Sequence, residues 1–75
     1  MTKSIKILTD NQLTVLPSLT NIFSRFGVMI EKLMVKAIEN AKFLFIKVSI
    51  YCDDIVFNRL IKQVEKQIEV ISVKA

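Results

Sequence analysis

Two hydrophobic periods alternate along this 75-residue chain, and their order limits the folds that it can adopt. The segments 4–8 ("SIKIL") and 42–51 ("KFLFIKVSIY") alternate apolar and other side chains, which is the period of a half-buried strand. Two other segments repeat apolar side chains every three or four positions, as a helix with one buried face does. The predicted helix stripes are Leu16, Leu19, Ile22, Phe23 and Phe26 in the first, and Val56, Phe57, Leu60, Ile61 and Val64 in the second.

Capping and turn residues mark the ends of the two helices. Thr14 is predicted to be the first N-cap, because Pro17 then falls in the first turn, where its missing N–H costs no hydrogen bond. Gly27 is expected to end this helix, since glycine tolerates the left-handed conformation common there. Asp53 and Asp54 are predicted to cap the second helix as side-chain acceptors near its positive end.

Two further strands complete the pattern. One is predicted to follow Gly27 and to run to about Val35, with Leu33 and Val35 on one face, and the other is predicted over 67–74 ("QIEVISVK"). The order β-α-β-β-α-β, with right-handed crossovers, predicts an α+β, ferredoxin-like fold. Residues 1–75 then form a single domain, whose four-stranded antiparallel sheet carries both helices on one face.

Such a sheet leaves its other face bare. The alternation puts Phe43, Phe45 and Tyr51 on that face, together with Met34. Scattered apolar side chains are common on protein surfaces, but two phenylalanines and a tyrosine on one strand favour a contact surface. We therefore expect a partner to dock there.

Composition excludes several classes of protein. Apolar residues make up 52% of the chain, too many for a disordered tail, and no run is long enough to span a bilayer. The first ten residues do not resemble a signal peptide, and the lone Cys52 forms no internal disulfide, so a cytoplasmic location is expected. With no histidine and no convergent carboxylates, we predict no catalysis, no metal site and no cofactor.

The first half of the chain resembles an ACT domain. The stretch "DNQLTVLPSLTNIFSRFGVMIEKLMV" is similar to the pattern Asn-x-Pro-Gly-x-Leu, followed by an apolar helix that ends in Phe-x-x-x-Gly-x-Asn-Ile. Asn11, Leu16, Phe23, Gly27 and Ile30 fall on that pattern. The ending "RLIKQVEKQIEVISVK" resembles the small, regulatory subunit of acetolactate synthase (acetohydroxyacid synthase), with matches at Gln63, Lys66, Ile68, Val70 and Val73.

The resemblance implies a homodimer joined through sheet edge strands, with a small branched-chain amino acid at the interface. Carried over by position, the effector site comprises Asn11, Gln12, Leu13, Thr14, Met29 and Ile30. Three positions depart from the pattern: Leu13 replaces the proline, Thr14 the glycine and Met29 the asparagine. Because a thioether is only a weak acceptor, we expect weak or no amino-acid binding.

The resemblance further implies the short, single-domain type of small subunit, a non-catalytic regulatory protein of branched-chain amino acid biosynthesis. Its partner would be the catalytic large subunit of acetolactate synthase, docked on the bare face or on the strand 28–35. Two alternatives remain open at this point. One is a free-standing ACT-type sensor of a small molecule, and the other is an RNA-binding module, disfavoured because Lys6 stands where a second stacking aromatic is needed.

Overall fold

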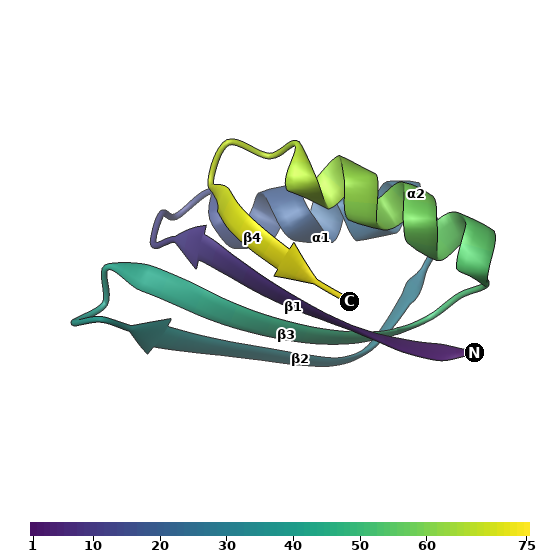
Figure 1. Ribbon diagram of the computed structural model, residues 1–75, viewed down its shortest axis with the longest axis horizontal. Coiled ribbons are helices and arrows are strands. Elements are labelled where there is room, and N and C mark those ends of the chain that lie inside the picture. The colour runs from purple at the N-terminus through teal and green to yellow at the C-terminus, as the bar shows by residue number, and fades with distance from the viewer.

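The computed structural model describes residues 1–75 and contains the six predicted elements in the predicted order. They are β1 (Thr2–Asp10), α1 (Val15–Arg25), β2 (Met29–Ile38), β3 (Phe43–Tyr51), α2 (Asp54–Glu65) and β4 (Val70–Lys74) (Figure 1). No helix in the structure has the length and apolar character needed to cross a membrane.

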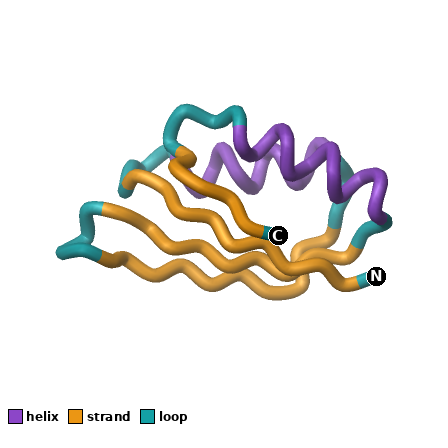
Figure 2. Tube along the Cα trace, viewed as in Figure 1, coloured by secondary structure: helices purple, strands orange, loops and turns teal.

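The four strands form one antiparallel sheet in the order β2-β3-β1-β4. Both helices lie on the same side of this sheet, and the other side is open (Figure 2). Strands β1 and β3 occupy the centre, whereas β2 and β4 are the two edges. The predicted ferredoxin-like, ACT-like architecture is therefore confirmed.

Alternate side chains of the two central strands build the core with the helices. Ile5 and Ile7 of β1 are fully buried, with Thr9 beyond them. The remaining core residues are Leu44, Ile46, Val48 and Ile50 of β3, Val15, Leu19, Ile22 and Phe23 of α1, and Leu60 and Val64 of α2. Val15 was missed by the predicted stripe, and Leu16 and Phe26, which were in it, are only half-buried.

The N-terminus of α1 differs from the prediction in one respect. Thr14 occupies the N-cap position and Pro17 lies in the first turn, as predicted, but the Thr14 side chain makes no capping hydrogen bond. At the other end, Gly27 adopts φ +68°, the left-handed conformation that favours glycine. Its role in ending the helix is confirmed.

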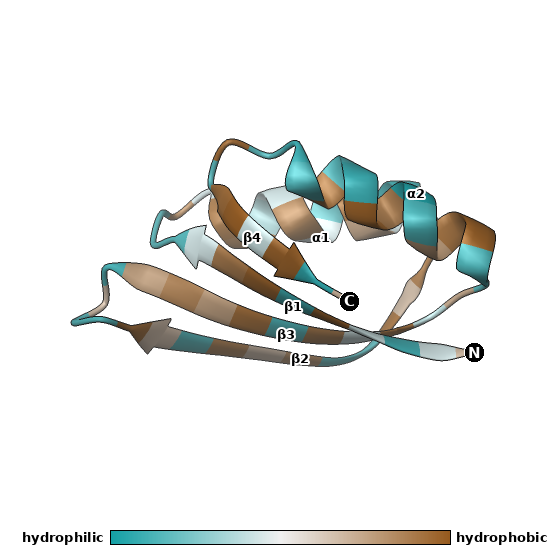
Figure 3. Ribbon diagram, viewed as in Figure 1, coloured by the Kyte–Doolittle hydropathy of each residue, from teal (hydrophilic) through white to brown (hydrophobic).

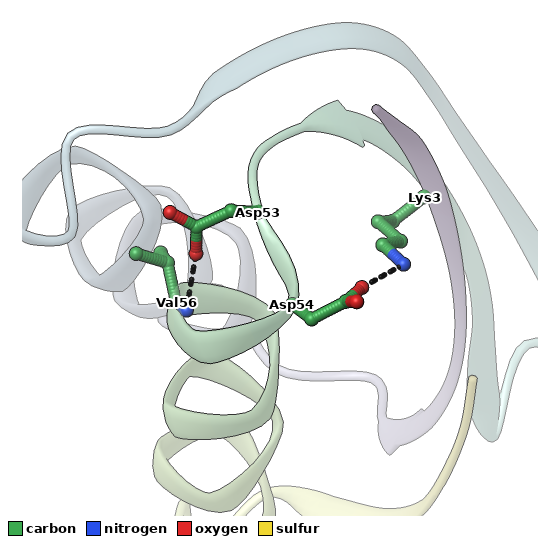
Figure 4. Close-up of polar contacts among 4 residues, drawn as sticks. All are labelled: Lys3, Asp53, Asp54 and Val56. Carbon is green, nitrogen blue, oxygen red and sulfur yellow. Dashed lines mark hydrogen bonds and ion pairs between the residues drawn. The ribbon is translucent and has the colours of Figure 1, made fainter.

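Strand β1 is tied to the start of α2 by charge (Figure 4). The Asp53 carboxylate accepts a hydrogen bond of 2.8 Å from the Val56 N–H, which confirms Asp53 as the cap. Asp54 pairs with Lys3 of β1. The Lys3 hydrogen bond, reinforced by its positive charge, holds the pKa of the Asp54 carboxyl below its ordinary value.

The strand ends differ from those predicted. Strand β1 extends at both ends beyond 4–8, and β2 continues to Ile38 rather than ending near Val35. Strand β4 begins at Val70, not Gln67, because the N–H of Gln67 donates to the Val64 carbonyl and continues the helical turn.

The register of the sheet aligns three lysines on its open face. Lys6 of β1 lies directly opposite Lys47 of β3 on one side and Lys74 of β4 on the other. Neighbouring strands are about 4.8 Å apart, so the backbones of the three lysines lie in one short row across the sheet. We call Lys47, Lys6 and Lys74 the lysine row. Like charges directly opposite one another destabilise a sheet.

Replacing the central lysine of the row should therefore stabilise the protein. We expect Lys6→Glu to raise the free energy of unfolding by about 0.5–1 kcal/mol, because two like-charge pairs become two opposite-charge pairs. Urea denaturation at low salt measures the change. Lys42→Glu, the same charge change in the β2–β3 turn, serves as the control and should stay within about 0.5 kcal/mol of the wild type. A Lys6→Glu variant no more stable than this control would contradict the prediction.

Candidate functional site

The loop that carries four of the predicted effector residues, residues 11–14, connects β1 to α1 and is exposed throughout. The Asn11 side-chain amide donates a 2.8 Å hydrogen bond to the Ala41 carbonyl, and the Asn11 N–H donates to the Lys42 carbonyl. Glu39, Asn40 and Ala41 all have positive φ, a conformation that costs non-glycine residues roughly 1–2 kcal/mol each. Asn11 therefore holds a strained turn in place.

The Thr14 side chain also makes a hydrogen bond within the chain. Its hydroxyl donates to the Glu69 carboxylate at 3.1 Å, and the Asp10 N–H donates to the Glu69 carbonyl at 2.9 Å. These bonds join the loop to the segment before β4. Beside them, the Leu13 side chain is 98% exposed, so the residue that replaces the expected proline contacts no part of the chain's core.

The other two predicted effector residues, Met29 and Ile30, lie at the opposite end of the sheet. Met29 pairs with Tyr51, which pairs with Thr2 at the start of β1. The loop follows Asp10, at the far end of β1. At about 3.3 Å per residue, the length of β2 sets these two groups about 30 Å apart. A single chain thus brings residues 11–14 together but not with Met29 and Ile30.

Strand β2 is a free edge whose apolar side chains the helices do not cover. Leu33 and Val35 lie opposite the buried Val48 and Ile46, so they share the helix-covered face of the sheet. They are nevertheless 45% and 39% exposed, and Met29 is 70% exposed. Figure 3 shows apolar segments along this free edge. The strand therefore presents both unpaired backbone groups and uncovered apolar side chains.

The open face of the sheet carries the three aromatic residues predicted for docking. Phe43, Phe45 and Tyr51 alternate with the buried residues of β3 and so point away from the helices. Phe43 and Phe45 are half-buried near one end, and Tyr51 is exposed at the other. Phe43 and Phe45 are therefore neighbours, but Tyr51 stands apart from them.

Two shallow hollows on the open face were not predicted. One, of about 540 Å³, is lined by Ser4, Lys32, Met34, Lys47 and Ser49 of the open face; Leu33, which lies between Lys32 and Met34 on β2 but shares the helix-covered face, also borders it. The other, of about 390 Å³, is lined by Lys6, Leu8, Phe45, Ser72 and Lys74. The strand alternation places each of these lysines and serines on the bare face, but only the register shows which of them are neighbours.

Cys52, at the junction of β3 and α2, is half-buried and unpaired. Burial raises the pKa of its thiol, and the negative charge of Asp53 raises it further. A protonated thiol is a poor nucleophile and a poor metal ligand. The structure contains no cluster of three or more histidine, cysteine, aspartate or glutamate side chains placed to hold a metal ion.

Solved structures share this fold at low sequence identity. The acetolactate synthase small subunit of Thermotoga maritima has a TM-score of 0.86 and 24% identity over 99% of the chain, which spans 46% of that subunit. The ACT domain of GTP pyrophosphokinase from Chlorobium tepidum has a TM-score of 0.84 and 16% identity, covering 99% of this chain and 95% of that one. A homoserine dehydrogenase from Thiobacillus denitrificans has a TM-score of 0.76 and 16% identity, and the match covers 99% of this chain and 17% of that enzyme. A search of curated proteins gave no match.

The sequence itself fits one family along nearly its whole length. The profile of the AHAS small subunit-like ACT domain, where AHAS is acetohydroxyacid synthase, matches residues 5–72. This match confirms the resemblance noted in the sequence, and the fold described above agrees with it. The chain belongs to the family of AHAS small subunit-like ACT domains.

Proposed function

We propose that this protein is a non-catalytic accessory subunit of acetolactate synthase in branched-chain amino acid biosynthesis. The observation that carries the proposal is the family match over residues 5–72. In this role the chain forms a homodimer, docks on the catalytic large subunit and raises the activity of that subunit by stabilising its productive arrangement. The proposed interfaces are two different surfaces, the β2 edge and the open face of the sheet.

The proposed dimer pairs β2 with β2 of a second copy. An unpaired edge strand of ten residues is a template for another strand, and a two-fold axis makes such pairing self-complementary. Leu33 and Val35 of the two copies would then meet on the helix side and leave water together. This arrangement gives the exposed apolar side chains of β2 a partner and joins two sheets into one of eight strands.

The same pairing would reunite the two halves of the predicted effector site. In antiparallel pairing, Met29 of one copy approaches the Ile38 end of the other copy's β2. The β2–β3 turn that follows Ile38 is bonded to Asn11, so the loop 11–14 lies at that end. The composite site would be poor in polar partners, because the side chains of Asn11 and Thr14 already donate within the chain.

The open face supports docking on the large subunit because the dimer leaves it free. Phe43 and Phe45 lie side by side on the central strand β3, with Leu8 opposite Phe45 and Ile38 opposite Phe43. These four side chains give one half-buried apolar centre, which is the arrangement that carries most of the binding energy in protein interfaces.

The first test is reconstitution with the purified catalytic large subunit from the same organism. We expect the chain to coelute with that subunit and to raise its rate of acetolactate formation. Phe45→Asp should abolish coelution, because it puts a charge at the apolar centre of the open face. Ile55→Asp is the matched control, since Ile55 is 67% exposed on α2, away from that face.

Circular dichroism of both variants shows whether each is folded. If folded Phe45→Asp binds the large subunit as tightly as Ile55→Asp does, the open face is not the interface. If the wild-type chain neither binds nor activates the large subunit, the accessory role is wrong and the free-standing sensor becomes the better hypothesis.

The second test is calorimetric titration with valine, leucine and isoleucine. We expect no saturable binding at micromolar concentrations, because Met29 offers no strong hydrogen bond to a charged amino acid. Met29→Asn should bind at least about tenfold more tightly than the wild type, since a hydrogen bond to a charged group contributes about 1.5–3 kcal/mol. Micromolar binding by the wild type would overturn the prediction.

A further inference from the structure

The open face of the sheet concentrates positive charge. Of the eleven basic side chains, five lie on this face: Lys6, Lys32, Lys36, Lys47 and Lys74. Two acids reach its ends, Asp10 opposite Phe43 and Glu31 through its hydrogen bond to Thr2. Neither forms an ion pair with these lysines, because the single salt bridge of the structure joins Lys3 to Asp54 on the helix side. The centre of the face therefore has no internal counter-charge.

This arrangement opposes the stability of the isolated sheet. Each neighbouring pair within the lysine row is a directly opposed like-charge pair, and an acidic residue at position 6 would relieve both. Local choices that work against folding are expected at functional sites. We infer that the open face docks an acidic surface of a protein partner, whose carboxylates supply the counter-charge that the chain lacks. The inference rests on the proposed function and names the chemistry of the large-subunit surface.

The two hollows have the chemistry that a carboxylate needs. In the larger one, Lys32 and Lys47 are accompanied by the hydroxyls of Ser4 and Ser49. In the smaller one, Lys6 and Lys74 flank Ser72. Ammonium and hydroxyl groups both donate to a carboxylate, and hydrogen bonds between charged partners are about twice as strong as neutral ones. Each hollow can therefore receive one aspartate or glutamate side chain of the partner.

A protein partner fits this face better than a nucleic acid does. Sequence-tolerant binding of single strands needs exposed aromatic faces on which bases stack. Here Phe43 and Phe45 are half-buried, and the exposed Tyr51 stands alone at the other end of β3, so the face offers no run of exposed aromatic rings. Both arginines, Arg25 and Arg59, lie on the helices. Lysines interleaved with Met34 and Leu8 form a mixed apolar and basic surface, which suits a protein surface of opposite charge.

The test measures the affinity of the catalytic large subunit for two charge-matched triple variants. The face variant carries Lys6→Gln, Lys47→Gln and Lys74→Gln, and the control carries Lys42→Gln, Lys62→Gln and Lys66→Gln, which lie outside the face. Calorimetry at about 50 mM and about 300 mM NaCl measures how much of the affinity depends on electrostatic attraction, which the higher salt concentration screens. Because glutamine removes the repulsion within the row, the face variant should fold at least as stably as the wild type, which urea denaturation checks.

We expect the face variant to lose about tenfold or more in affinity at low salt and the control less than about twofold. Raising the salt should weaken binding by the wild type and the control more than binding by the face variant, which keeps only Lys32 and Lys36 of the five lysines on the face. Equal loss in both variants, or a salt dependence as steep in the face variant as in the control, would overturn the inference while the accessory role stands. Absence of any binding by the wild type would overturn the proposed function, and this assignment of the partner with it.

Tight, salt-dependent binding of a single-stranded RNA 12-mer that the face variant alone loses would also overturn the inference, because the face would then bind nucleic acid.

Discussion

The uncovered edge strand β2 is the feature on which the rest of this structure depends. The helices bury the core-facing side chains of β1 from Ile5 to Thr9 and of β3 from Leu44 to Ile50, yet Leu33 and Val35 of β2, on that same face, remain largely exposed. A chain of this length buries only about 60% of the surface that it exposes when unfolded, so an apolar edge left open is a substantial loss. Covering β2 with a second copy would extend the core and bring together the two groups of predicted effector residues.

The fold could be predicted from the sequence because its signals are local and agree with one another. The alternation on β3, the single glycine at position 27 and the cap at Asp53 each specify one element, and together they allow few topologies. The ends of the helices and strands were harder to predict, because they depend on hydrogen bonds to other segments of the chain. Strand β4 begins later than predicted because Gln67 still belongs to the turn after α2. Val15 lies four residues before Leu19 and seven before Ile22, so the helical period alone could have predicted its burial.

The sites were harder to predict because they depend on register. No single segment shows that Lys6 lies between Lys47 and Lys74, or that Met29 and the loop 11–14 are at opposite ends of the sheet. The internal use of Asn11 could not be predicted either, since its acceptor is 30 residues away in the β2–β3 turn. The polar side chains of Asn11 and Thr14 in this loop therefore make hydrogen bonds within the chain, which leaves fewer donors for a ligand.

Hydrogen exchange of the β2 backbone amides tests the central claim most directly, namely that a second copy pairs with this edge. In an isolated chain, the β2 amides that point away from β3 face water and exchange at unprotected rates. We predict that these amides are protected in the wild type at high protein concentration and lose protection on dilution or in Val35→Lys. Ile71→Lys, the same change on the other edge strand, should leave them protected. Unprotected exchange along the outer side of β2 at every concentration would contradict the account.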